Sequence, residues 1–163
     1  MVYRTFTANQ NYCNVTPSGG TFANDTTVNI TCGHNVRRLS YQWDGGAITS
    51  ATLPATLTYT ADKSHKLTVI FVYNYQSGSI SKERTAKFSK TFNLRRCVDS
   101  EVGTSNEFKG SIVYTINTKV NNYADSCSAK TLIEYYCDSS NYVKYKKVSC
   151  PYGCGNGVCL ATR

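Results

Sequence analysis

Cysteines set the strongest limit on what this chain can fold into. Six of its eight cysteines lie between residues 97 and 159, and the last three fall within Cys150-Pro-Tyr-Gly-Cys154-Gly-Asn-Gly-Val-Cys159. Glycines and a proline in that stretch exclude a helix or a central strand, so we expect a tight cross-linked knot. The even count favours an oxidising, extracellular compartment and disulfides at every cysteine. The eight are Cys13, Cys32, Cys97, Cys127, Cys137, Cys150, Cys154 and Cys159.

The cysteine distribution divides the 163 residues into two predicted domains. Residues 12–94 have the long apolar runs of a conventional core, whereas residues 95–163 are too few for a large core and need disulfides. Thirteen tyrosines and a single methionine favour strands over helices. We therefore expect an all-β protein in which an Ig-like β-sandwich over 12–94 precedes a small disulfide-rich β module over 95–163. Residues 1–11 form an N-terminal extension.

Alternating side chains predict the strands of the first domain. Residues 27–32 place Val28, Ile30 and Cys32 inward and their Thr and Asn neighbours outward. Residues 66–75 are apolar on both faces, as in a central strand. Residues 84–94 put their apolar side chains on one face, interrupted only by a lysine; these are Ala86, Phe88, Phe92 and Leu94. With turn signals such as Asp44-Gly45-Gly46, the pattern of about seven short strands is typical of an Ig-like sandwich.

Three short motifs in the first domain resemble a known family. They are Pro17-Ser-Gly-Gly-Thr-Phe22, the Thr-Val-Asn-Ile-Thr that follows, and Tyr41 leading into Asp44-Gly45. Together they resemble the Ig-like domain appended to chitobiase and β-hexosaminidase type enzymes and to many secreted surface proteins. The resemblance covers about residues 12 to 80. It implies an accessory sandwich with no catalytic residues to transfer.

The second domain should contain a strand over 110–120 and a hairpin over 131–150 with its turn at 138–141. Its motifs resemble a cysteine-rich module that recurs in predicted secreted and surface proteins of archaea and uncultivated bacterial lineages. The matching pieces are Cys-x-Asp-x-acidic-x-Gly, Tyr-x-Asp-x-Cys, Leu-x-Glu-Tyr-Tyr-Cys and Cys-Pro-x-Gly-Cys-x-x-Gly-x-Cys within residues 97–160. The resemblance implies an extracellular module without a catalytic assignment.

Disulfides are favoured over zinc. The last three cysteines are not spaced as paired knuckles, and the two histidines lie in the other domain. Cys13 with Cys32 is the natural pair for the first domain. Six cysteines in the second domain allow about fifteen connectivities, so the pairing of Cys97 with Cys127 is only a first choice. For Asp99, Glu101 and Asp125, capping of the local backbone is favoured over calcium binding. No metal or other cofactor is expected.

Charge and sequons indicate possible partners. The formal net charge is +8, but the basic residues are dispersed, which favours solvated faces over a nucleic-acid site. Acidic glycans stay open as partners, and no run is long enough to span a membrane. The sequence begins without a signal peptide. Three Asn-x-Thr sequons, at Asn14, Asn24 and Asn29, predict glycosylation of an exported protein.

Two functions remain open, and no catalytic residues are expected because neither a glycosidase carboxylate pair nor a nucleophile motif is recognisable. Residues 1–11 alternate like a strand, which serves either as the edge of its own domain or as a donated strand in a neighbour's sheet. Donation makes the chain a self-assembling subunit of a surface filament or sheath, with Val2, Tyr3 and Phe6 at the interface. The alternative is a secreted carbohydrate-binding or adhesive module that contacts glycans through Trp43 and Tyr145.

Overall fold

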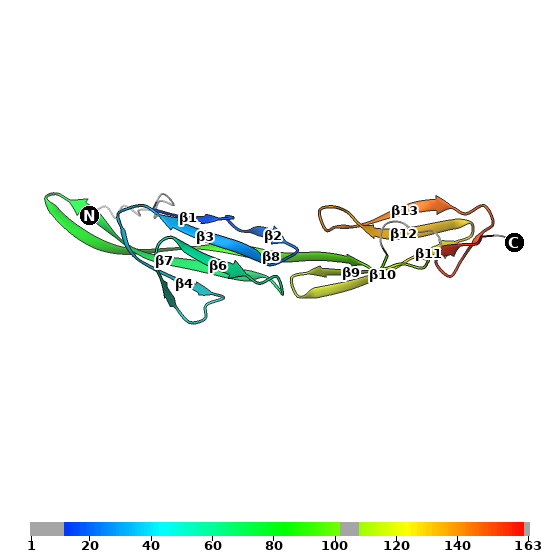
Figure 1. Ribbon diagram of the computed structural model, residues 1–163, viewed down its shortest axis with the longest axis horizontal. Helices are drawn as coiled ribbons and strands as arrows, with labels where there is room; N and C mark the ends of the chain where they lie inside the picture. Colours follow the sequence, from blue (N-terminus) through cyan, green and yellow to red (C-terminus); the bar gives the residue numbers. More distant parts are fainter. Residues whose placement is uncertain (1–11, 102–107, 162–163) are drawn as a thin grey trace, which may run out of the picture. The chain divides into compact units, whose positions relative to one another are not determined.

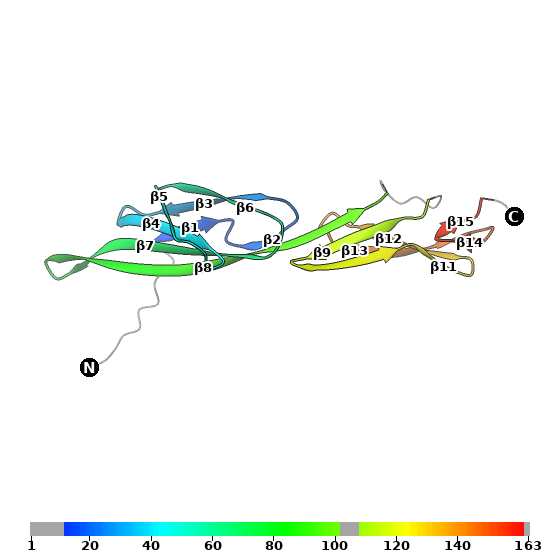
Figure 2. The same cartoon turned by 90° about the horizontal axis from the view of Figure 1, so that it is seen from below.

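The computed structural model describes residues 12–101 and 108–161, and all regular secondary structure in these residues is β-strand (Figures 1 and 2). The all-β prediction is confirmed. The described residues form two compact units: unit 1 ends at Asn93, and unit 2 begins at Leu94. This lies next to the predicted junction at Arg95. Phe22–Asn24 also belong to unit 2, where Arg96 Nε donates a hydrogen bond to the Ala23 carbonyl at 2.9 Å.

Unit 1 is an Ig-like sandwich of two antiparallel sheets. One sheet has the strand order β1-β3-β6, and the other has the order β8-β7-β4-β5. The chain therefore crosses between the sheets from β3 to β4 and again from β6 to β7. Short β2 pairs with β8 at the end of the unit. The strands are β1 (Cys13–Thr16), β2 (Gly20–Phe22), β3 (Thr26–Cys32), β4 (Val36–Trp43), β5 (Thr49–Ala51), β6 (Ala55–Tyr59), β7 (His65–Ser77) and β8 (Ile80–Asp99).

The core of unit 1 follows the alternation in the sequence. Val28 and Ile30 are fully buried and their β3 neighbours are exposed, as predicted. β7 lies between β4 and β8 and buries Leu67 to Val69 consecutively, which confirms the predicted central strand. Along β8, Phe92 is fully buried. Apolar burial of this extent is the main stabilising contribution to the sandwich.

The hairpin turn after β4 has the predicted chemistry. Asp44 and Gly45 both have positive φ, at 52° and 75°. Such angles are tolerated best by Gly, Asn and Asp, and the turn is closed by Gly46 N, which donates to the Trp43 carbonyl at 2.8 Å. The short edge strand β5 follows and pairs with Leu39 to Tyr41 of β4. Its polar Thr-Ser-Ala sequence gave no strand signal.

Unit 2 consists of small antiparallel sheets. The end of β8 pairs with β9 (Ser111–Ile116), and β9 pairs with β10 (Lys119–Ala124). A second sheet has the order β11-β12-β13, with β11 (Ser126–Ser128), β12 (Thr131–Cys137) and β13 (Val143–Ser149). The short strands β14 (Cys154–Gly155) and β15 (Val158–Cys159) form the closing knot. The hairpin of β12 and β13 confirms the turn predicted at 138–141.

The single strand predicted over 110–120 is wrong, because a tight turn divides it into β9 and β10. Asn117 stands at this turn with φ 54°. Its backbone N–H donates to the Leu94 carbonyl at 2.8 Å, and its Oδ1 accepts from Leu94 N at 3.0 Å. Asparagine tolerates this left-handed conformation better than other side-chain-bearing residues. The Asn-Thr pair between two apolar runs was therefore an overlooked turn signal.

All eight cysteines form disulfides, as predicted. Cys13 bonds to Cys32, which confirms the pair expected in the first domain. The proposed pairing of Cys97 with Cys127 is wrong. The bonds in unit 2 are Cys97–Cys137, Cys127–Cys154 and Cys150–Cys159. Cys127 lies on β11, which pairs with β12, and it bonds to Cys154 of the knot. Cys97 bonds instead to the last residue of β12.

Candidate functional site

The candidate site is an unpaired sheet edge in unit 1. β7 pairs with β8 from Ile80 to Phe92 on one side. On the other side, Gly19, the residue before β2, lies close to Thr91: a Cβ built on Gly19 would come 2.6 Å from the Thr91 carbonyl oxygen. β2 follows and pairs with β8. Among residues 12–101 and 108–161, no strand pairs with residues 80–90 on that side. We call residues 80–90 the open edge.

The open edge lies beside the edge of the other sheet. β1 stands at the end of the order β1-β3-β6, and among the described strands it pairs with β3 alone. A cavity of about 210 Å³ separates the two edges. It is lined by Cys13, Asn14, Val15, Ser18, Phe88 and Lys90. Within residues 12–101 and 108–161, the sandwich therefore has a side on which neither sheet continues.

Apolar side chains of the open edge are only half covered. Phe88 and Ala86 point to the same side of β8 as Phe92, yet both are half-buried whereas Phe92 is fully buried. The Phe88 ring contacts Phe71 edge-on at 6.2 Å, and Lys90 Nζ lies 5.9 Å from its centroid. A strand added at this edge would cover these side chains and satisfy the backbone groups of β8.

The predicted interface residues Val2, Tyr3 and Phe6 lie outside the described residues. The first described residue, Tyr12, packs its ring on Tyr73 at 4.2 Å. Its carbonyl accepts a hydrogen bond from Gly33 N at 2.8 Å, which extends the pairing of β1 with β3 by one step. The chain is therefore anchored in the sandwich from Tyr12 onward.

A second cluster in unit 1 holds His65 between two carboxylates. His65 Nδ1 lies 2.6 Å from Asp44 Oδ2, and His65 Nε2 lies 2.5 Å from Asp62 Oδ1. Lys66 N donates to the other oxygen of Asp44 at 2.7 Å. These contacts tie the turn after β4 to the segment before β7. Both ring nitrogens are thus engaged by carboxylate oxygens.

Charge pairing shifts the pKa values in this cluster. Burial on its own would lower the pKa of His65, but its hydrogen bonds to Asp62 and Asp44 outweigh burial and raise it. For Asp44, burial opposes the shift, and the hydrogen bonds from Lys66 N and His65 lower the pKa. The hydrogen bond to His65 lowers the pKa of Asp62. The histidine is thereby favoured in its charged form. No group of three or more His, Cys, Asp or Glu within the described part of the chain could hold a metal ion.

The two predicted glycan contacts differ in environment. Trp43 packs against Phe92, His65 and Tyr59, with ring centroids 5.6, 6.0 and 6.5 Å away. This aromatic cluster makes Trp43 a packing residue beside a cavity of about 190 Å³. Tyr145 in unit 2 is 60 % exposed.

Tyr145 belongs to a row of three tyrosines that sequence reasoning identified only in part. Its ring lies 6.1 Å from that of Tyr135, its cross-strand partner, which in turn lies 5.4 Å from Tyr123 of β10. The sequence alone does not show that Tyr123 belongs to this row, because that depends on how β10 lies against β12. In the turn of the same hairpin, the Tyr142 ring stacks under the Arg95 guanidinium at 3.8 Å.

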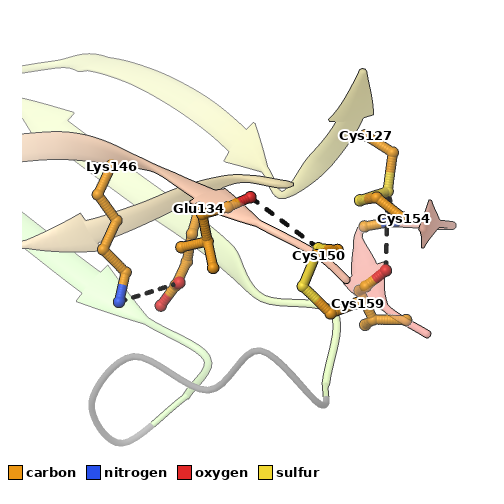
Figure 3. The surroundings of a disulfide bond; sticks show 9 residues. Cys127, Glu134, Lys146, Cys150, Cys154 and Cys159 are labelled. Atoms are coloured by element: carbon orange, nitrogen blue, oxygen red, sulfur yellow. Dashed lines mark hydrogen bonds and ion pairs between the residues drawn. A yellow bond between two sulfur atoms is a disulfide. The ribbon is translucent and has the colours of Figure 1, made fainter. Parts of the chain in front are cut away.

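Two buried carboxylates in unit 2, Asp125 and Glu134, have partners on other strands or loops, and Figure 3 shows the ion-pair partner of Glu134. Asp125 accepts hydrogen bonds from Gly110 N at 2.9 Å and Tyr135 N at 2.8 Å, so it binds distant backbone, and the local capping predicted for it is wrong. Local capping is confirmed at Asp99, whose Oδ1 accepts from Glu101 N at 3.1 Å. Glu134 is 1 % exposed and lies 3.2 Å from Lys146 Nζ. Sequence reasoning missed Glu134, although strand alternation places it on the same face of β12 as buried Leu132.

Comparison with protein-family models, curated proteins and solved structures found no match to this chain. Among the described residues, no helix is long and apolar enough to cross a membrane. Four disulfides indicate an oxidising environment such as the extracellular space.

Proposed function

We propose that this protein is a non-enzymatic structural subunit that assembles with copies of itself into an extracellular filament or sheath. The observation that carries the proposal is the open edge at residues 80–90, with half-buried Phe88 beside the cavity of about 210 Å³. An unpaired edge with partly exposed apolar side chains is a template for an added strand. Four disulfides support a role outside the cell.

The donated strand is residues 1–11 of a second copy. This segment has as many residues as the open edge, and its alternation separates Val2 and Phe6 from Tyr3, Thr5 and Thr7. Main-chain hydrogen bonds to β8 would supply affinity, and Val2 and Phe6 would cover Phe88 and fill the cavity. Lysines along the edge, including Lys82 and Lys90, limit pairing with unrelated strands. Each subunit then carries one donor and one acceptor, which generates an open polymer.

The test deletes residues 1–10 from the full chain and follows assembly by electron microscopy and light scattering. The truncated protein should stay a folded monomer, since its core begins at Tyr12. A synthetic peptide of residues 1–11 should bind this monomer, and the same peptide added to the intact chain should block polymer growth.

A matched pair of substitutions locates the interface. Phe6→Asp should prevent assembly because the charge would be placed in the cavity, whereas Thr5→Asp on the opposite face of the strand should leave assembly intact. Phe88→Ser tests the acceptor in the same way. Polymers that survive the deletion, or equal effects of the two aspartates, would refute strand donation.

Carbohydrate binding is the second candidate, and the tyrosine row of unit 2 favours it, because Tyr145 is exposed beside half-buried Tyr135 and Tyr123. Aromatic faces at the surface of a β-sheet can stack on sugar rings. If this function holds, a monomer should bind a glycan array and lose binding in Tyr145→Ala without unfolding. Trp43→Ala should act through the stability of unit 1, because Trp43 lies in the aromatic cluster.

A further inference from the structure

The outer face of the sheet β1-β3-β6 is built from threonine and asparagine. Thr27, Asn29 and Thr31 alternate with the buried residues of β3, and the exposed positions of its neighbours are also Thr or Asn. The neighbours are Asn14 and Thr16 on β1, and Thr56 and Thr58 on β6. All seven side chains are exposed and uncharged.

Two of the three sequons lie side by side on this face, on the paired strands β1 and β3. In the antiparallel register of β1 and β3, Asn14 stands opposite Thr31, and Thr16 stands opposite Asn29. The Asn and Thr of each sequon are two residues apart, so they share the exposed face. Asn14 and Asn29 are therefore diagonal neighbours, with about 7–8 Å between such positions on paired strands. The third sequon asparagine, Asn24, is exposed but belongs to unit 2.

The acceptor atom of Asn29 has the right environment for modification. Thr56 Oγ1 donates to Asn29 Oδ1 at 3.1 Å, which holds the amide through its oxygen. Within the described residues, no hydrogen bond engages Asn29 Nδ2, the atom that a glycan would occupy. Asn14 is exposed on the edge strand β1. A sugar at either position would disturb no buried group, because both asparagines are exposed, although Asn14 also lines the cavity of about 210 Å³ beside the open edge.

The outer face of the other sheet differs from this one. There, Lys66 and Lys87 stand beside Ile48, Ile70 and Thr68 around a depression of about 500 Å³. Exposed Ile48 makes that face partly apolar. The two faces of the same sandwich thus have different chemistry, and only the Asn/Thr face carries paired sequons.

We propose that the outer face of β1-β3-β6 is a glycan-bearing face with Asn14 and Asn29 as its N-linked acceptors. The donor is an oligosaccharide carried on a lipid phosphate or diphosphate. The bond between its anomeric carbon and the phosphate oxygen breaks, and the anomeric carbon bonds to Asn Nδ2. The amide nitrogen loses one proton and the lipid phosphate leaves. This assignment does not depend on strand donation.

The test expresses the full chain in a host whose secretory pathway performs N-glycosylation. The Asn24→Gln background removes the third sequon, and intact mass is measured before and after enzymatic release of N-glycans. The folded protein should carry glycans at both asparagines. Thr16→Val should remove the glycan at Asn14, Thr31→Val should remove the one at Asn29, and the double variant should carry none.

Thr58→Val is the matched control, because Thr58 is exposed on the same face and lies outside the sequons. Its glycan mass should equal that of the background. Peptide mapping then assigns each glycan, since enzymatic release converts its asparagine to aspartate. A secreted, disulfide-bonded protein whose mass equals that of the bare chain would overturn the proposal. So would glycans confined to one of the two asparagines.

Discussion

Unit 1 and unit 2 are stabilised in different ways. Unit 1 buries a continuous apolar interior, in which the largest fully buried side chains include Tyr59, Phe92 and Leu67. In the described part of unit 2, the fully buried apolar residues outside the cysteines are Ile112 and Leu132. Unit 2 compensates with three disulfides, whereas unit 1 has one. A small domain with few apolar side chains needs covalent constraint to remain folded.

The disulfides also have different structural roles. Cys13 and Cys32 are directly opposite each other on β1 and β3, so their bond joins strands that already pair. Cys97 is on β8 and Cys137 is on β12, which belong to different sheets of unit 2. Removal of the first bond leaves a hydrogen-bonded ladder in place. Removal of the second removes a connection that no strand pairing among the described residues replaces.

The largest expected effect comes from opening the Cys97–Cys137 disulfide. The bond spans 40 residues, and the chain-entropy model assigns such a loop about 4 kcal/mol. A core as small as that of unit 2 rarely supplies more than about 3–5 kcal/mol. In Cys97→Ala/Cys137→Ala, hydrogen exchange measured by mass spectrometry should show lost protection across residues 111–159, with protection retained in β3 and β7.

Cys13→Ala/Cys32→Ala is the matched control for this experiment. Its loop spans 19 residues and is assigned about 3 kcal/mol by the same model. Unit 1 should nevertheless stay folded, because its apolar core is intact. Equal loss of protection in the two units after either substitution would show that their stabilities are not set separately.

Removing the ion-pair partner of buried Glu134 should lower the stability of unit 2 by a smaller amount. Lys146→Met leaves Glu134 without its ion pair. Loss of one partner from a buried pair costs about 3–5 kcal/mol, and we expect the lower end because Lys146 is 38 % exposed. Urea unfolding of unit 2, followed by hydrogen exchange, measures the change.

Two variants show whether charge causes that effect. Glu134→Leu/Lys146→Met removes both charges, and replacement of a buried pair by apolar side chains is often neutral or stabilising. Lys147→Met changes an exposed lysine of the same strand and should alter the unfolding free energy by less than about 0.5 kcal/mol. If the double variant is as unstable as Lys146→Met alone, packing of the lysine stem is responsible instead.

The fold of unit 1 could be predicted because local sequence and tertiary burial agree. Val28 and Ile30 alternate with Thr and Asn, and the burial of β3 repeats that alternation residue by residue. Its disulfide joins the only two cysteines of the domain. β5 escaped prediction because a three-residue edge strand of Thr, Ser and Ala carries no apolar period.

The details of unit 2 were less predictable because they depend on contacts between distant segments. Six cysteines admit many pairings, and strand periodicity does not distinguish Cys127 from Cys137 as the partner of Cys97. The partner of Glu134 became evident only from the register that places it opposite Lys146. The candidate site also depends on contacts between distant segments. The alternation of residues 84–94 predicted correctly which side chains of β8 share a face, but only the strand order shows that one side of β8 is open.

The smallest expected effect is a pH dependence confined to unit 1. The folded pKa of His65 is raised above its ordinary value of 6.5, so its stabilisation is present below that value and is lost as pH rises through the folded pKa. The pKa values of Asp44 and Asp62 are lowered from 3.8. Their stabilisation is present above that value and is lost as pH falls through the folded pKa.

The wild-type protein should therefore exceed His65→Gln in stability most clearly between roughly pH 4 and 6.5, and the difference should shrink at higher pH. Trp43, the single tryptophan, contacts His65 at 6.0 Å, so its fluorescence reports the unfolding of unit 1. Asp44→Asn/Asp62→Asn should remove the pH dependence while retaining the histidine. A stability difference that grows from pH 6 to pH 9 would contradict the charged cluster. Because the two aspartates are substantially exposed, the effect should remain below that of Lys146→Met in unit 2.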